Sequence, residues 1–386
     1  MRRLPRARLV LSLIAASRLL LHGTAACLAN GSLRYDVRAE LGAEYDSNAH
    51  RAETVTGADD RLIVASPLGR GAIGAHLSDV VARGQQLALA ATLAGKLFAA
   101  AAARSENVAI AQTSGMWRLA LGDRSALAVQ SLYYEAFQPA SGDPASADER
   151  RDFRSLTPQV QLERRFADSV AVTVGLGYRW FVFKSDLDFD FSAPVGALDL
   201  RWTRESADGG ADWELGVGSS LERRSFAGPA IARSGTAPTA TQRLDNFLVN
   251  HLELTRVGVA LLGVGYALHW NGSNSYGEAL IRHLATVRVA APLPLQVYLA
   301  ARAELIIASY QDPIAVGRDP TTAQLLSIDD ENRSSLRVDL SRALSSSGGV
   351  LLLARYTLYV NELGVQAAAT RYQRQTAMLS LAFTIN

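Results

Sequence analysis

The segment Ser169–Phe183, SVAVTVGLGYRWFVF, alternates between two kinds of side chain from Val170 to Trp180. The apolar and aromatic set comprises Val170, Val172, Val174, Leu176, Tyr178, Trp180 and Val182. The small or polar set comprises Ala171, Thr173, Gly175, Gly177 and Arg179. Successive side chains of a β-strand point to opposite faces, so this pattern predicts a strand with one apolar face and one polar face.

The same period of two recurs towards both ends of the chain. Leu33, Tyr35, Val37, Leu41 and Tyr45 alternate with Arg34, Asp36, Arg38, Glu40 and Glu44. Leu336, Val338 and Leu340 alternate with Arg337, Asp339 and Ser341. After residue 29, no apolar run approaches the roughly 18 to 20 residues that a membrane helix needs. The sequence therefore predicts an all-β protein.

The breaks between alternating segments differ in length and polarity along the chain. Short, turn-like breaks fall near Asp79–Gly84, Gly122–Arg124, Ala167–Ser169, Ser206–Gly210, Arg256–Gly258, Pro292–Pro294 and Ser345–Gly349. Mostly longer, polar breaks fall at Asp46–Arg61, Ala99–Glu106, Gln138–Arg150, Ser185–Asp188, Ala227–Thr241, Asn271–Gly277, Gln311–Asp330 and Glu362–Thr370. The two kinds alternate strictly, which indicates hairpins of about 16 strands, within a range of about 14 to 18.

Two architectures could use such strands. A soluble β-sandwich or propeller buries its apolar faces between sheets and usually has shorter strands. A transmembrane antiparallel up-and-down β-barrel turns its apolar face to lipid and has short periplasmic turns and longer extracellular loops. Arg and Glu recur on the second face of many strands, and burying them in a dry sandwich would carry a large desolvation cost. The transmembrane barrel is therefore the predicted fold.

The N-terminus predicts an exported protein. Arg2, Arg3, Arg6 and Arg8 precede the apolar run 9–16, and small residues follow from Thr24 to Ala29, the order of a secretory signal peptide. We expect cleavage after Ala29, which gives a signal peptide of residues 1–29 and a barrel of residues 30–386. Cleavage after Ala26 is the alternative, and it would leave Cys27 as the N-terminal residue of a lipoprotein.

The last segment resembles the C-terminal strand that bacterial outer-membrane β-barrels present to the barrel-assembly machinery. One face comprises Gln373, Gln375, Ala377, Leu379, Leu381, Phe383 and Ile385. The chain departs from that pattern at its final residue, which is Asn386 instead of an aromatic residue. The resemblance implies a location in the outer membrane of a Gram-negative bacterium, with outer-membrane lipid and the assembly machinery as partners.

A second resemblance lies at the end of the first predicted strand. Tyr45-Asp46-Ser47-Asn48 resembles the strand-one ending of outer-membrane barrels that are associated with exopolysaccharide and capsule secretion. The resemblance implies a conduit for polysaccharide, with periplasmic polysaccharide-export components as partners. A structural alternative remains: Asp46, Ser47 and Asn48 end the strand and begin a turn through hydrogen bonds from their side chains to the backbone.

Sixteen strands leave room for an aqueous channel, whereas the side chains of an eight-stranded barrel fill its interior. Residues predicted to line the lumen are mixed in sign: Arg34, Arg38, Glu40, Glu44, Arg179, Arg282, Arg288, Arg302, Glu304, Arg337, Asp339, Arg355 and Arg374. No ring of one sign stands out, so strong ion selectivity is not expected. A conduit for exopolysaccharide is the favoured function, and a general diffusion porin for small polar solutes is the alternative.

An outer-membrane enzyme is a third, less favoured hypothesis. His251 and Glu253 share a face and could form an acid–base pair, but no nucleophile or third ligand stands at a recognisable spacing. We therefore expect no catalytic residues, metal or cofactor. The 39 basic and 37 acidic residues also argue against a nucleic-acid partner, because such proteins carry a basic excess on one face.

Overall fold

The computed structural model describes residues 33–50, 54–55, 63–137, 152–184, 187–204, 212–232, 237–312, 333–345, 349–360, 370–371 and 373–385. The predicted signal peptide and Cys27 lie outside these residues, as does most of the predicted loop Gln311–Asp330. Within the described ranges, no helix combines the length and apolar character needed to cross a bilayer.

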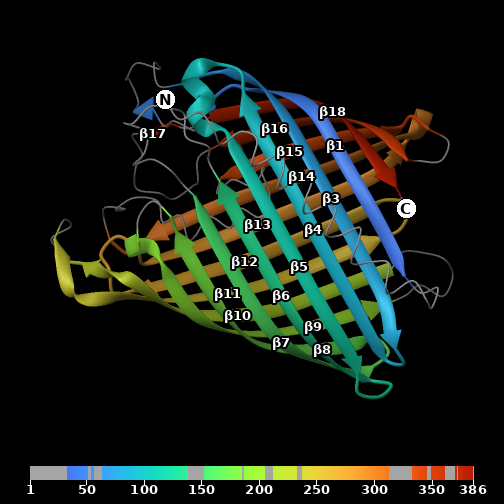
Figure 1. Cartoon of the computed structure of the whole chain (residues 1–386), viewed down its shortest axis with the longest axis horizontal. Coiled ribbons are helices and arrows are strands. Elements are labelled where there is room, and N and C mark those ends of the chain that lie inside the picture. The colour runs from blue at the N-terminus through green and yellow to red at the C-terminus, as the bar shows by residue number, and fades with distance from the viewer. Residues whose placement is uncertain are drawn as a thin grey trace, which may run out of the picture.

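The chain forms one closed antiparallel barrel of 16 strands, as the sequence predicts (Figure 1). The strands are β1 (Arg34–Asp46), β3 (Ser66–Ala82), β4 (Gln85–Phe98), β5 (Val108–Ala120), β6 (Ser125–Phe137), β7 (Phe153–Ala167), β8 (Val170–Phe183), β9 (Phe191–Arg204), β10 (Asp212–Ile231), β11 (Pro238–Val257), β12 (Leu261–Ser273), β13 (Leu280–Leu293), β14 (Val297–Tyr310), β15 (Ser334–Ala343), β16 (Val350–Val360) and β18 (Gln373–Ile385). Each strand pairs with the next one in the chain, and β1 pairs with β18 from Val37↔Ile385 to Asp46↔Thr376. Closure leaves no sheet edge unpaired, which a hydrocarbon environment requires.

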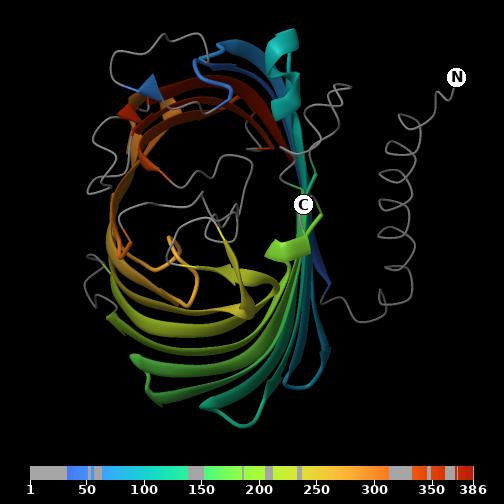
Figure 2. The ribbon, with the colours of Figure 1, turned by 90° about the vertical axis from the view of Figure 1, so that its left-hand side faces the viewer.

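The connections separate the barrel into two rims. The short-turn rim carries the seven predicted short connections, such as 83–84 and 168–169, and the first and last strands also begin and end there. The opposite, long-loop rim carries the other connections and faces the viewer in Figure 2. Two short strands from its first and last loops, β2 (Thr54–Val55) and β17 (Thr370–Arg371), pair with each other. The connections alternate between the two rims as predicted, but not strictly in length, because the connection 205–211 on the short-turn rim is longer than 232–237 and 274–279 on the other.

One predicted loop is mostly strand. Residues 227–231 continue β10 and residues 238–241 belong to β11, so this hairpin projects beyond its neighbours at the long-loop rim (Figure 1). The ladder shifts register between Ser225 and Ile231, a β-bulge that bends the hairpin. Its end is held by Tyr276, whose backbone N–H donates to the Ile231 carbonyl at 3.0 Å. The polar composition of this segment concealed its pairing.

The outer surface of the barrel is apolar. Leu41, Leu176 and Leu379 are exposed by 65%, 68% and 56%, and they occupy the outward positions that the alternation predicts. Among the aromatic residues near strand ends, Tyr45, Trp180, Trp213 and Trp270 are also exposed. Tyr310 pairs with the inward residue Leu280 and therefore faces the interior. A closed barrel with an apolar exterior and a polar interior is an outer-membrane β-barrel.

Candidate functional site

The alternation of the strands places all 13 predicted lumen residues on the inner side of the wall. In β1 the even-numbered positions face inward. Residues paired across adjacent strands lie on the same face of the sheet, so pairs such as Arg302↔Arg337 and Tyr359↔Arg374 give the inward positions of the other strands. The inward residues are Arg34, Arg38, Glu40, Glu44, Arg179, Arg282, Arg288, Arg302, Glu304, Arg337, Asp339, Arg355 and Arg374. Their surroundings differ, because Glu44, Arg282 and Arg374 are buried instead of bordering lumen water.

One buried ionic cluster lies on β1, β3 and β4 near the long-loop rim. Glu44 accepts hydrogen bonds from Arg70 Nη1 at 2.9 Å and from Lys96 Nζ at 3.0 Å. Arg70 Nε also lies 3.6 Å from Glu40 Oε1. Two cations thus meet two carboxylates on three adjacent strands, so the cluster compensates its own charge while holding the strands in register.

The segment Tyr45-Asp46-Ser47-Asn48 lies at the seam where the first strand meets the last. Asp46 accepts from Arg374 Nη2 at 2.6 Å and Nε at 3.0 Å, and both side chains are almost fully buried. Asn48 N–H donates to Asp46 Oδ1 at 2.9 Å, which forms an Asx turn. Ser47 Oγ accepts from the Gln375 backbone N–H at 2.8 Å. The segment therefore both ends its strand and joins residues 328 positions apart in the chain.

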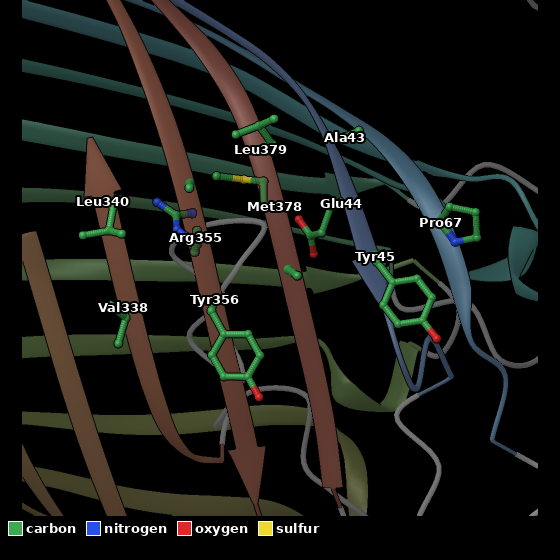
Figure 3. A pocket seen from close by; sticks show the side chains of 12 residues that line it. Ala43, Glu44, Tyr45, Pro67, Val338, Leu340, Arg355, Tyr356, Met378 and Leu379 are labelled. Carbon is green, nitrogen blue, oxygen red and sulfur yellow. The ribbon is translucent and has the colours of Figure 1, made fainter. Parts of the chain in front are cut away.

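The outer face of the same seam carries an apolar groove of about 620 Å³ (Figure 3). Tyr45 and Tyr356 border the groove, and the short side chains of Ala43, Ala354 and Ala377 form its floor. Tyr45 points away from the barrel in this view, whereas Glu44 is on the other face of its strand. This groove belongs to the lipid-facing surface and not to the lumen.

A second buried ionic cluster lies on the opposite side of the barrel. Glu222 contacts Arg179 at 2.8 Å and Arg224 at 3.1 Å. Further along, Arg243 contacts Asp245 at 2.7 Å and Glu278 at 3.1 Å. These clusters again gather in the half of the interior nearer the long loops.

A row of neighbouring aromatic rings, stacked except for its last pair, crosses five adjacent strands beside this cluster. The row consists of Tyr134, Phe153, Phe181, Phe191 and Phe226, with successive ring centroids 5.4, 5.2, 5.0 and 5.2 Å apart. Arg224 lies 4.2 Å from the Phe247 ring centroid, and Arg243 lies 4.1 Å from that of Phe226. All five rings are buried, so they stabilise the wall and do not offer a stacking surface to a solute.

The half of the interior nearer the short turns has ion pairs that are open to solvent. Arg201 contacts Glu214 at 3.1 Å, with side chains 69% and 49% exposed. Arg288 pairs with Glu253, and Arg302 pairs with Glu304. Arg288, Arg302 and Arg337 are lateral neighbours on adjacent strands, and each of them contacts a carboxylate, so this surface is hydrophilic with its cations compensated.

The wall of β4–β8 differs, because its inward residues are mostly neutral. Ala90, Ser114, Leu132 and Thr157 form one lateral row, and Ala88, Met116, Gln130 and Gln159 form the next. Together they line a depression of about 380 Å³, bounded by His76 and Arg179. We call these eight residues the neutral patch. Only Arg179 belongs to the predicted lumen set, although Gln130 and Gln159 stand at inward positions of alternating segments.

The two residues of the enzyme hypothesis have separate partners. His251 Nε2 lies 3.5 Å from Asp199 Oδ1, while Glu253 pairs with Arg288 and accepts from Thr255 Oγ1 at 3.3 Å. Gly218 stands between Asp199 and His251, and a Cβ there would lie 2.2 Å from Asp199 Oδ1. In the part of the chain that the structure describes, no group of three or more His, Cys, Asp or Glu residues could hold a metal ion.

No protein-family model and no curated protein matches the sequence. Similar solved folds include OpdQ of Pseudomonas aeruginosa, at 9% identity and a TM-score of 0.49, covering 92% of this chain and 98% of that one. OmpT of Vibrio cholerae gives 12% identity, a TM-score of 0.44 and coverages of 92% and 97%. A triple mutant of the Rhodopseudomonas blastica porin gives 10% identity, a TM-score of 0.37 and coverages of 92% and 100%. The outer-membrane assignment rests on the closed sheet and apolar exterior of this chain itself.

Proposed function

We propose that this barrel is a conduit that carries exopolysaccharide across the outer membrane. The supporting observation is the lumen wall, which combines exposed, mutually neutralising ion pairs such as Arg201–Glu214 with the neutral patch, where two amides and two hydroxyls stand among apolar side chains. Such a wall interacts with hydroxyl groups by hydrogen bonds but does not hold a polymer strongly by charge. The resemblance of Tyr45-Asp46-Ser47-Asn48 to polysaccharide-associated barrels adds to the proposal.

The short-turn rim faces the periplasm in this proposal, following the usual orientation of outer-membrane barrels. Periplasmic polysaccharide-export components would then dock at that rim and deliver polymer to the solvent-exposed half of the interior.

A general diffusion porin for small polar solutes is the second candidate. The same exposed ion pairs favour it equally, because a mixed-sign wetted wall admits solutes of either charge. Deletion of the gene separates the two functions. Loss of secreted polymer with unchanged uptake of small sugars and amino acids supports export. Unchanged polymer with slower uptake supports the porin and refutes the conduit.

A further inference from the structure

We propose that the neutral patch is a binding site for uncharged hexopyranose chains; this inference rests on the proposed function and narrows its substrate class. Its volume of about 380 Å³ lies within the range of small-molecule sites. The site occupies one side of the inner wall, where a chain passing through the lumen would contact it. Nothing charged belongs to the eight residues of the patch.

The arrangement of polar and apolar groups suits a sugar ring. Leu132 lies between Ser114 and Thr157 in one row, and in the next row Met116 lies beside Gln130, which pairs with Gln159. A pyranose presents C–H groups on its ring faces and hydroxyls around its edge. The apolar side chains can therefore contact a ring face while the amides bond the hydroxyls.

The two amides retain hydrogen-bonding capacity that points to a ligand. Gln159 Oε1 accepts from Gln130 Nε2 at 2.9 Å and from Gln161 Nε2 at 3.4 Å. Within the described residues, no protein group accepts from Gln159 Nε2 and none donates to Gln130 Oε1. The site thus offers two N–H donors beside a carbonyl acceptor, the combination that recognises neighbouring hydroxyls.

Small residues of the wall let the two amides lie close to the sheet and leave the depression unfilled. Gln159 crosses Gly177 of β8, where a Cβ would lie 2.5 Å from Gln159 Cγ. Ala88 and Ala90 on β4 leave the other side of the depression unfilled. Gly177 therefore places the Gln159 amide against the wall, so the group does not block the lumen.

The charged neighbours already have partners. Arg179 pairs with Glu222 at 2.8 Å and donates to Thr157 Oγ1 at 3.3 Å, and His76 lies 3.5 Å from Asp36. A sugar carboxylate in the patch would lose water without gaining a free cation, which is unfavourable. This favours neutral chains over uronic acid chains.

Binding to the purified, folded barrel tests the proposal. The detergent must lack a sugar head group, so an amine oxide is used, and the probes are maltohexaose, cellohexaose and hexagalacturonate. We expect isothermal titration to give dissociation constants on the order of millimolar for a neutral hexaose, and weaker binding of hexagalacturonate. No heat from either neutral probe up to tens of millimolar, or tighter binding of hexagalacturonate, would overturn the proposal.

Variants locate the site. Gln130→Leu and Gln159→Leu should each weaken neutral hexaose binding by roughly five- to tenfold, because each removes hydrogen bonds. Ala90→Phe keeps both amides but fills the depression, and it should abolish binding. Gln112→Leu is the matched control on the same wall and should bind as the unaltered barrel does. Equal affinity in all four variants, or equal loss in the control, would overturn the assignment.

The failure of this inference can be told apart from failure of the proposed function. If deletion of the gene leaves secreted polymer unchanged while the purified barrel still binds a neutral hexaose through Gln159, export is refuted and the site stands. If deletion abolishes the polymer but no neutral hexaose binds, export stands and the site is refuted.

Discussion

The two halves of the barrel interior use the same residue types in different ways. Near the long-loop rim, Arg374 and Asp46 are 4% and 0% exposed and form a bidentate pair. Nearer the short turns, Arg302 is 53% exposed beside Glu304. Removing one member of a buried ion pair is costly because the other charge stays buried without a counter-charge. An exposed ion pair contributes little to the free energy of unfolding. Charge in the first half therefore fixes the architecture, and charge in the second half wets the lumen.

The largest expected effect comes from breaking the buried pair at the seam. Arg374→Met should lower the free energy of unfolding by about 3–5 kcal/mol, because Asp46 stays buried without its cation. Arg302→Met, the matched change in the open half, should cost less than about 1 kcal/mol. Guanidinium unfolding in phospholipid vesicles measures both.

The double variant Asp46→Asn, Arg374→Met removes both charges of the seam pair. It should recover part of the stability lost in Arg374→Met alone, since no uncompensated charge remains. Equal destabilisation by Arg374→Met and Arg302→Met would contradict the contrast between the two halves.

A smaller effect is expected from the aromatic row. Phe226 is fully buried between Phe191 and the Arg243 guanidinium. Phe226→Leu should cost about 1–2 kcal/mol, because it removes a ring contact and a cation–π contact. Phe166→Leu changes an aromatic residue that is 61% exposed at the short-turn rim and should leave stability nearly unchanged. The same unfolding measurement checks the pair, and a larger loss for Phe166→Leu would count against a stabilising role of the row.

The smallest effect is a gain in the short-turn half. Leu295 and Gln296, in the turn after β13, have φ values of 62° and 58°, which are unfavourable for residues with a Cβ. Replacing this pair by Asn-Gly should stabilise the barrel by about 1 kcal/mol, because these residues tolerate positive φ. A rise in the temperature at which the folded band is lost in heat-modifiability gels would register it, and no rise would show that the turn is not strained.

Local patterns predicted much of this fold. The hairpins are visible in the sequence as segments of period-two alternation separated by polar or turn-forming breaks. Segments such as Val170–Phe183 therefore predicted both the count of 16 strands and the two kinds of rim. Prediction was wrong at residues 227–231 and 238–241, where small and polar residues are paired as strand. Polar composition alone does not reveal a backbone partner.

The candidate site was less accessible to sequence reasoning. The predicted lumen residues were all charged, whereas Gln130 and Gln159 belong to no recognisable motif. The contact between these two side chains depends on the register between β6 and β7. The role of Asp46 was equally hidden, because its partner Arg374 is far away in the chain.

What the sequence determined by itself is the facing of side chains, because the alternation of a strand is a property of consecutive residues and needs no partner. Only the tertiary structure decided which inward charges are buried, which remain wet and which neutral side chains share a depression. Those outcomes depend on register, on closure of β1 against β18 and on how the loops fold at the rim. All three are set by contacts between residues that are distant in the chain.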